Sequence, residues 1–268
     1  MSVAAPVVLT VAGSDPSGGA GLQADLKTIH QHGGYGAAVP TLITAQNTNG
    51  VEAVEVLSPD LIRAQLSTLL ADLKPAAAKT GALGSRAVAH VVGSIMAESD
   101  FPWVVDPVWL PSRGRPLARG DVVEAYREAI LPRAALVTPN ALEAGLLADM
   151  PVRSLAEARK AAERLAAFGS GAVLVKGGHL EGPAHGTDVL LHDGVIVELA
   201  ATELVSGRFH GTGCALSAAI ATRLALGDDI PSALAIAKRW LTDALREAFS
   251  VGQGALPVNH LWPVDDKP

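Results

Sequence analysis

The chain has 268 residues, of which 49% are hydrophobic and 18% are charged, with one cysteine and a formal net charge of −6. A chain of this length buries about three quarters of its unfolded surface, so its core needs no metal or disulfide. The lone Cys214 excludes an intramolecular disulfide and a zinc cluster, and it favours a reducing cytoplasm. The negative charge argues against nucleic acid or an anionic membrane as a partner, and no run reaches the roughly 18 apolar residues of a membrane span. We therefore expect a cytoplasmic protein with a small-molecule partner.

Short β-branched runs alternate with longer Ala- and Leu-rich helical patterns, which is typical of βαβ units around a mainly parallel sheet. The pattern predicts strands at 7–12, 37–43, 76–79, 103–106, 136–138 and 173–176. It predicts helices at 20–32, 60–72, 86–97, 121–129, 140–148, 155–168, 214–226 and 231–249. A hairpin of 189–191 and 195–199 around Gly194 favours antiparallel edge strands. The sequence therefore predicts one α/β domain over residues 1–268, a three-layer α/β/α sandwich with a mainly parallel central sheet and antiparallel edge strands.

The first of three glycine-rich loops, residues 13–21, directly follows the first predicted strand. It is not a P-loop, because Gly19 and Ala20 stand where that motif has Lys and Ser or Thr, and it lacks the G-x-G-x-x-G spacing of dinucleotide sites. A strand-to-helix turn explains some glycines. Four glycines in nine residues exceed what one turn needs, so a loop that approaches a ligand is favoured.

The second and third loops are candidate phosphate sites. Lys176 precedes two glycines at the end of a predicted strand, where ligands of open α/β sheets bind, although a solvated lysine before a turn fits equally well. Gly211, Thr212, Gly213 and Cys214 lead into an alanine-rich helix, whose first backbone N–H groups can cradle an anion. The alternative is an ordinary glycine turn in which the cysteine is a small buried residue.

Several acidic and amide side chains lie near predicted strand ends. Asn140 and Glu143 have the spacing of a helix capping box, and the same pair can orient magnesium-bound waters; spacing alone leaves both open. Asp106 ends a buried strand, where a carboxylate takes part in chemistry or caps a loop. Asp25 and Gln46 fit either a site or ordinary helix and turn positions. The aperiodic segment 109–120 is long for such a connection and predicts a mobile lid or a surface loop.

The combination of these motifs resembles the hydroxymethylpyrimidine/phosphomethylpyrimidine kinases of thiamine biosynthesis, which have the ribokinase-like fold. The first and last motifs are highly specific, and the motifs follow the family order from residue 7 to about residue 262. They are Ala12-Gly13-Ser14-Asp15-Pro16-Ser17-Gly18-Gly19-Ala20-Gly21-Leu22-Gln23-Ala24-Asp25-Leu26-Lys27-Thr28, Ala45-Gln46-Asn47-Thr48, Lys79-Thr80-Gly81, Asp106-Pro107-Val108, Thr138-Pro139-Asn140, Val175-Lys176-Gly177-Gly178-His179 and His210-Gly211-Thr212-Gly213-Cys214.

The resemblance implies ATP-dependent phosphorylation of 4-amino-5-hydroxymethyl-2-methylpyrimidine and then of its monophosphate to the diphosphate, with Mg²⁺, in a homodimer. It implies that the pyrimidine contacts Gly13, Asp25, Gln46, Ala82 and Val108. It implies that the anion hole for the transferring phosphoryl group comprises Gly211, Thr212, Gly213 and Cys214. It further implies that ATP contacts Lys176, Thr212 and Asn140, and that magnesium binds Asp106, Asn140 and Glu143 directly or through water.

Cys214 stands where related sugar kinases of the fold carry a catalytic aspartate. Because a helix N-terminus lowers the pKa of a thiol, we hypothesise that Cys214 accepts the proton of the hydroxymethyl group. Ala82 stands where the family usually has methionine, which leaves the pocket roomier, and residues 109–114 depart from the usual lid segment.

Two other functions stay open. One is pyridoxal or pyridoxine kinase activity, because relatives with the Gly-Thr-Gly-Cys ending accept vitamin B6 aldehydes, whose carbonyl Cys214 could attack. The other is a non-catalytic protein that binds the pyrimidine or a nucleotide; the candidate phosphate and magnesium positions argue against it.

Overall fold

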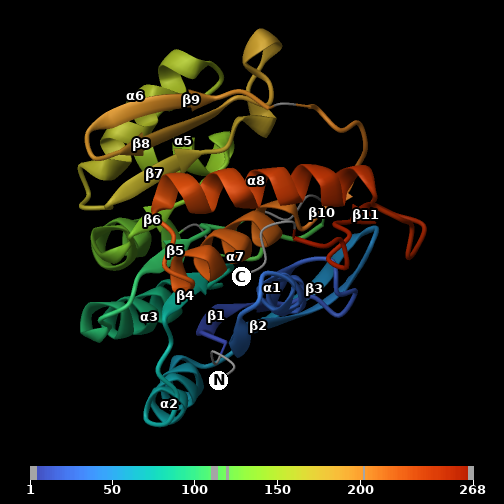
Figure 1. The fold of residues 1–268 in the computed structure, drawn as a ribbon. Helices are drawn as coiled ribbons and strands as arrows, with labels where there is room; N and C mark the ends of the chain where they lie inside the picture. Colours follow the sequence, from blue (N-terminus) through green and yellow to red (C-terminus); the bar gives the residue numbers. More distant parts are fainter. Residues whose placement is uncertain (1–4, 110–113, 119–120, 202, 265–268) are drawn as a thin grey trace.

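The computed structural model describes residues 5–109, 114–118, 121–201 and 203–264. A nine-stranded sheet in the order β3-β2-β1-β4-β5-β6-β7-β8-β9 runs through these residues (Figure 1). Its strands are β1 (Val7–Ser14), β2 (Tyr35–Asn47), β3 (Gly50–Val56), β4 (Ala77–Thr80), β5 (Trp103–Val105), β6 (Leu136–Val137), β7 (Ala172–Val175), β8 (Asp188–His192) and β9 (Val195–Leu199). Neighbouring strands within the run β2-β1-β4-β5-β6-β7 pair in parallel. The strands β3, β8 and β9 pair antiparallel with their neighbours. The predicted parallel sheet with antiparallel edges is confirmed.

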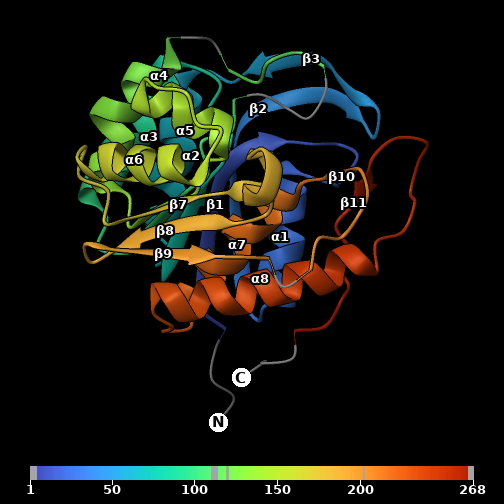
Figure 2. The ribbon, with the colours of Figure 1, turned by 90° about the horizontal axis from the view of Figure 1, so that it is seen from above.

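Helices cover both faces of the sheet. They are α1 (Gly21–Gln31), α2 (Pro59–Leu70), α3 (Arg86–Glu98), α4 (Val122–Ala125), α5 (Ala141–Ala148), α6 (Leu155–Ala166), α7 (Thr212–Ala225) and α8 (Ile230–Arg246). Figure 2 shows α1, α7 and α8 on one face and the other helices on the opposite face. Successive strand side chains point to opposite faces, so Val8 packs in the cluster under α7 and α8 while Leu9 packs in the cluster under α2, α3, α5 and α6. The three-layer sandwich is therefore confirmed.

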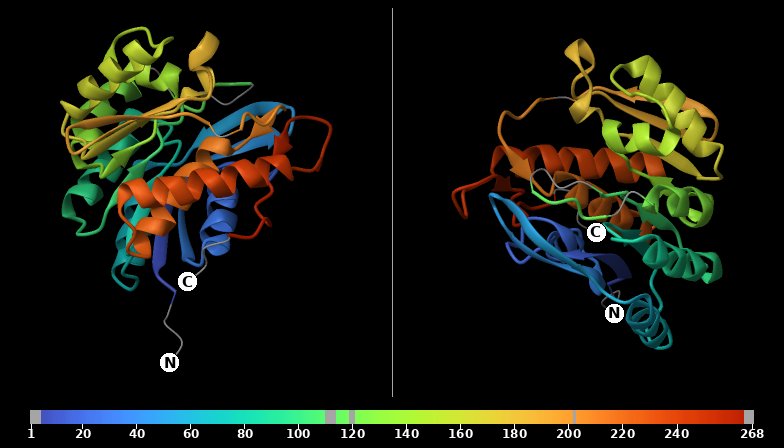
Figure 3. Two further views of the ribbon diagram at one scale, coloured as in Figure 1. Left: turned by 45° about the horizontal axis from the view of Figure 1, so that its top comes forward. Right: turned by 180° about the vertical axis from the view of Figure 1, so that it is seen from behind.

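Some elements differ from those predicted. The edge strand β3 was not predicted, and it extends β2 into a long antiparallel ribbon at one end of the sheet, opposite the β8–β9 hairpin (Figure 3). The predicted helix at 121–129 is instead the short α4 followed by the π-helical turn Tyr126–Ile130 and the 3₁₀ turn Leu131–Arg133. Two further 3₁₀ turns are Gly177–His179 and Gly182–Ala184. A separate two-stranded pair, β10 (Phe209–His210) with β11 (Leu256–Pro257), also lay outside the prediction.

The parallel strands place the sequence motifs together. The carboxyl ends of β1, β4, β5, β6 and β7 meet at one edge of the sheet, which is where ligands of such folds bind. The predicted lid near 109–120 lies partly outside the described residues and stays a prediction. Its described part includes Gly114, which bridges to Val51, and the buried Trp109. Across the described ranges, no helix has the length and apolar character to cross a membrane.

Candidate active site

A cavity of about 360 Å³ lies at the carboxyl edge of the parallel strands. Its wall combines the ends of strands from both halves of the sheet with the start of α7. All but one of the site residues predicted from the sequence line this cavity. They are Gly13, Gln46, Ala82, Asp106, Val108, Asn140, Glu143, Lys176, Gly211, Thr212, Gly213 and Cys214. The candidate substrate, phosphate and magnesium residues therefore share one space.

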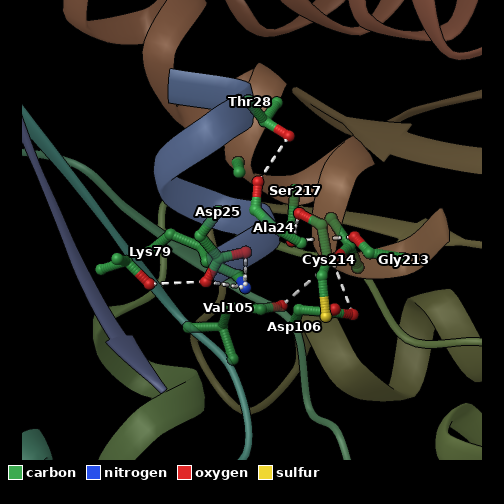
Figure 4. Close-up of polar contacts among 12 residues, drawn as sticks. Ala24, Asp25, Thr28, Lys79, Val105, Asp106, Gly213, Cys214 and Ser217 are labelled. Carbon is green, nitrogen blue, oxygen red and sulfur yellow. Dashed lines mark hydrogen bonds and ion pairs between the residues drawn. The ribbon is translucent and has the colours of Figure 1, made fainter. Parts of the chain in front are cut away.

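Asp25 is the exception. Its side chain is completely buried within α1, and its carboxylate accepts hydrogen bonds from Lys79 Nζ at 2.7 and 2.8 Å and from Thr10 Oγ1 at 2.6 Å. Lys79, which the sequence marked only as part of a motif, lines the cavity in its place. Asp25 is fully buried in an ion pair with Lys79 and is not among the residues that line the cavity, so its contact with the pyrimidine stays a prediction. Figure 4 shows this pair beside Cys214 and Asp106.

The anion cradle forms where β10 leads into α7. Gly211 has a left-handed φ of 79° and precedes the first residue of the helix. The first helical hydrogen bond runs from the Ala215 N–H to the Gly211 carbonyl, 2.9 Å. The backbone N–H groups of Thr212, Gly213 and Cys214 therefore have no partner within the helix and lie at the positive end of its dipole. This arrangement suits a phosphate oxygen.

The Cys214 thiol is less acidic than the sequence predicted. Burial raises its pKa to about 11, and the nearby Lys79 ammonium only partly opposes this effect. The hypothesis of a pKa lowered by the helix N-terminus is therefore wrong in direction. At neutral pH the side chain is a thiol, so it has little capacity to remove a proton.

A lysine and a carboxylate meet beneath the cradle. Lys176 Nζ lies 2.7 Å from Asp106 Oδ1. A β-carbon built on Gly213 would approach Lys176 Nζ to 3.0 Å and Asp106 Oδ2 to 3.4 Å, which places both groups against the cradle. Burial acts to lower the pKa of Lys176, but the carboxylates of Asp106 and Glu143 outweigh it and raise that pKa. Lys176 is therefore a cation at the point where phosphate oxygens would bind.

Asn140 and Glu143 form the capping box of α5. The Glu143 N–H donates to Asn140 Oδ1 at 3.0 Å, and the Asn140 N–H donates to Glu143 Oε2 at 2.8 Å. Both residues also line the cavity. Burial, together with the charge of Asp106, raises the pKa of Glu143 to about 7, while Lys176 opposes the rise. The capping interpretation is confirmed, and the same side chains remain available to the site.

The residues present fit a magnesium ion that keeps several of its waters. Asp106 Oδ2 is buried and has no hydrogen-bond partner among the described residues. The candidate ligands are two carboxylates, of Asp106 and Glu143, and the Asn140 amide. Within the described part of the chain, no group of three or more acidic, histidine or cysteine side chains is placed to hold a metal ion by itself. Magnesium in nucleotide sites is commonly held by one or two carboxylates, with phosphates and waters completing its shell. This donor set is therefore suited to magnesium that arrives with a nucleotide.

Asp15 and His210 join the substrate end of the cavity to the cradle, a link that sequence reasoning missed. His210 Nε2 lies 2.8 Å from Asp15 Oδ2 and 3.1 Å from Gln46 Nε2. Burial acts to raise the pKa of Asp15, but hydrogen bonds from His210 and Ser17 outweigh it and lower that pKa. The carboxylate also accepts the Ala20 N–H at 2.9 Å. Asp15 thus fixes the first glycine-rich loop to the residue that precedes Gly211.

Asp188 holds the turn that follows Lys176 in place through two hydrogen bonds. Asp188 Oδ1 accepts the Gly177 N–H at 2.7 Å, and Asp188 Oδ2 accepts a hydrogen bond from Lys238 Nζ at 2.5 Å. The carboxylate therefore ties the turn after β7 to α8. Both Asp188 and Lys238 line the cavity, although neither stands in a motif quoted from the sequence.

The fold and this cavity define a kinase of small molecules. The defining features are an open α/β sheet, an anion cradle at a helix start, a largely buried lysine–carboxylate pair beneath it, and a cavity that joins them to Gln46. Phosphoryl transfer depends mainly on positioning and charge neutralisation, which these groups are placed to supply.

Comparison with known proteins gives the family. Residues 15–259 match the family model described as phosphomethylpyrimidine kinase. The chain is 41% identical over 263 residues to the hydroxymethylpyrimidine/phosphomethylpyrimidine kinase of Synechococcus elongatus, covering 98% of this chain and 100% of that one. It is 40% identical to the enzyme of the same name from Streptomyces coelicolor, covering 98% and 97%. The chain therefore belongs to the phosphomethylpyrimidine kinase family and is a phosphotransferase, which argues against a non-catalytic binding protein.

Solved structures include two kinds of vitamin kinase with this fold. The ADP complex of pyridoxal kinase from Bacillus subtilis has a TM-score of 0.86 at 32% identity, covering 97% of this chain and 98% of that one. The phosphomethylpyrimidine kinase of Clostridium difficile has a TM-score of 0.79 at 35% identity, covering 90% and 99%. The predicted ribokinase-like fold is confirmed.

Proposed function

We propose that the protein transfers the terminal phosphoryl group of ATP to 4-amino-5-hydroxymethyl-2-methylpyrimidine, and then to the monophosphate to give the diphosphate. One observation carries this proposal: a single cavity contains both the Gln46 carboxamide and the anion cradle that starts at Gly211. A substrate held by its ring at Gln46 can therefore present its hydroxymethyl group at the cradle.

The substrate end of the cavity suits a flat aminopyrimidine. The Gln46 carboxamide has one acceptor and two donor hydrogens, so it can pair with an amino group and the adjacent ring nitrogen. Residue 13 lines the cavity without a side chain, and it is restricted to glycine because a β-carbon there would lie 2.5 Å from Leu42 Cδ1. Ala82 and Val108 complete an apolar wall.

At the other end, the chain's own groups neutralise phosphate charge. The N–H groups of Thr212, Gly213 and Cys214 bind the oxygens of the transferring group, and Lys176 binds those of ATP, with Asn140 and Thr212 on the nucleotide side. Because the transition state is loose, fixed donors contribute more than a strong base. Cys214 therefore acts by position, as a neutral thiol beside the attacking oxygen.

We further propose that Asp106, Asn140 and Glu143 hold Mg²⁺, directly or through water. The ion supplies neutralisation of phosphate charge. Asp106 supports this role with an unpartnered buried oxygen, and Glu143 supports it with a carboxylate beside Lys176.

Product analysis tests the proposal. The protein is incubated with Mg-ATP and either hydroxymethylpyrimidine or pyridoxal at equal concentration, and the products are measured by mass spectrometry. We expect the pyrimidine monophosphate and then the diphosphate. Preferential phosphorylation of pyridoxal would overturn the assignment, and accumulation of the monophosphate alone would remove the second step.

Pyridoxal kinase activity is the second candidate. Two features favour it: the similarity to a solved pyridoxal kinase, and the small Ala82 on the cavity wall, which leaves room for a bulkier ring. Against it, the Gln46 carboxamide matches an amino-substituted ring with an adjacent nitrogen, a pattern that pyridoxal lacks. The same product analysis separates the two candidates.

We propose a cytoplasmic homodimer as the working form. A single free thiol and the use of ATP fit a reducing compartment. The edge strand β9 exposes Val195 and Val197, an apolar row of the kind that protein interfaces cover. Light scattering coupled to size-exclusion chromatography should give about twice the chain mass, and a monomer at micromolar concentration would contradict the proposal.

A further inference from the structure

Lys79 is a fully buried cation that the phosphoryl-transfer scheme above does not use. Its side chain is 0% exposed to solvent, yet the residue lines the cavity. An ammonium group has three N–H donors. Within the described residues, its hydrogen bonds go to the two oxygens of Asp25, at 2.7 and 2.8 Å. One donor therefore remains without a hydrogen-bond partner among the residues that the structure describes.

The surrounding residues bring this ammonium to the cavity wall. A β-carbon built on Gly81 would lie 3.3 Å from Lys79 Nζ and 2.8 Å from Ala12 Cβ. Gly81 and Ala12 also line the cavity. Residue 81 thus carries no side chain that would fill the space beside the Lys79 ammonium at this part of the wall.

Both oxygens of the Asp25 carboxylate accept hydrogen bonds from Lys79. Asp25 accepts a further hydrogen bond from Thr10 Oγ1, 2.6 Å, so this carboxylate is itself fixed. Burial acts to lower the pKa of Lys79, but the charges of the Asp25 and Asp106 carboxylates outweigh it and raise that pKa. Figure 4 shows the ion pair beside Cys214 and Asp106. Lys79 is thus protonated at neutral pH and is buried away from water, where an N–H donor without a hydrogen-bond partner costs free energy.

We propose that Lys79 binds the substrate directly, donating its remaining N–H to an acceptor atom of the bound molecule, and that Asp25 is the residue that positions it. The acceptor is either a ring nitrogen or the hydroxymethyl oxygen. This inference rests on the proposed function, because it assigns the polar contact of that same cavity. In this proposal Lys79, rather than Asp25, makes the direct contact with the substrate.

The test compares Lys79→Met with the wild-type protein. Methionine keeps a similar length but removes the charge and the donor. Dissociation constants are measured by calorimetry, and kcat by product formation, for hydroxymethylpyrimidine and for its two deaza analogues, in which one ring nitrogen is replaced by C–H. A hydrogen bond from a charged donor changes affinity roughly 10- to 100-fold.

The two acceptors give different results. If Lys79 binds a ring nitrogen, one deaza analogue binds the wild type roughly 10- to 100-fold more weakly than the parent, and Lys79→Met removes that difference. If Lys79 binds the hydroxymethyl oxygen, Lys79→Met lowers kcat while the deaza analogues respond alike in both proteins. Either result supports the inference.

Thr10→Val is the matched control, since it removes a hydrogen bond to Asp25 but leaves the ion pair. We expect it to retain wild-type affinity and kcat. The inference is overturned if Lys79→Met keeps both quantities within about twofold, or if its affinity falls equally for all three compounds with kcat unchanged, as a merely structural role requires.

A second measurement applies if Lys79→Met does not fold. In wild-type protein labelled with ¹⁵N at the lysine ammonium groups, substrate should shift the resonance of the buried ammonium, and no shift would overturn the inference. Failure of the proposed function has a separate signature, because the wild type would then form no product from the pyrimidine. Failure of this inference leaves wild-type turnover intact.

Discussion

Gly211 and Gly19 touch through their backbones, although one belongs to the cradle before α7 and the other to the first glycine-rich loop. A β-carbon on Gly211 would lie 1.8 Å from the Gly19 carbonyl oxygen. The two loops are also joined by the contact between Asp15 and His210. The substrate loop and the phosphate cradle are therefore packed directly against each other and joined by a side-chain contact.

We predict that Gly211→Ala loses at least roughly 100-fold in kcat, comparable with the loss of a preorganised anion donor. The alanine cannot avoid the Gly19 carbonyl, so the cradle N–H groups must move. Turnover with Mg-ATP and the pyrimidine measures the loss.

Gly227→Ala is the control for this prediction. Gly227 has a left-handed φ of 99°, but no atom of the described residues lies within 4 Å of a β-carbon built on it. Its substitution should cost roughly 1–2 kcal/mol of stability through backbone strain alone and leave kcat unchanged. Equal losses of kcat in the two variants would contradict the role of the Gly211–Gly19 contact.

Asp15 should stabilise the fold in a pH-dependent way. Its pKa is lower in the folded protein than the ordinary 3.8, so its contribution is complete above pH 3.8 and disappears as the pH falls through the folded value. Asp15→Asn should therefore be less stable than the wild type at pH 7, with a difference that narrows below pH 3.8. Urea unfolding midpoints of both proteins measure this, and a difference that does not change with pH would exclude the ionised carboxylate as its source.

Local patterns located most of the site because glycine turns and polar strand ends have signatures of their own. The Asn140–Glu143 capping box and the start of α7 are of this kind. The Asp15–His210 contact joins residues 195 positions apart, and nothing local marks it. Similarly, the pattern of α1 did not reveal that Asp25 faces Lys79, because that depends on the packing of α1 against β1 and β4.

The pKa of Cys214 illustrates a second limit of sequence reasoning. A helix N-terminus stabilises a thiolate, and burial disfavours it. The sequence showed the first effect, whereas the depth of the thiol depends on the surrounding loops and reverses the outcome. The edge strand β3 was missed for a related reason, since its Val and Glu alternation is short and gains its structure from pairing with β2.

Cys214→Ser should remain active, because Cys214 does not serve as the base of the reaction. With a pKa of about 11, the thiol is almost entirely protonated at pH 7.5, so replacing it with a hydroxyl removes no working base. We expect a loss in kcat smaller than the roughly 100-fold that removal of a general base causes. Steady-state rates of the two proteins measure this. A loss of 100-fold or more, with a change in the pH profile, would restore the thiolate mechanism.

Alkylation of Cys214 should report the same pKa directly, because the chain has no other thiol. Iodoacetamide reacts with the thiolate, whose fraction in a group of pKa about 11 rises about tenfold per pH unit between pH 8 and pH 10. The rate should therefore keep rising through pH 10, whereas that of N-acetylcysteine levels off as the pH passes its own lower pKa. The modified fraction is measured by intact mass spectrometry. Alkylation rates are compared only at pH values at which the circular dichroism spectrum of the protein is unchanged. A plateau below pH 9 would show that the helix dipole outweighs burial at Cys214.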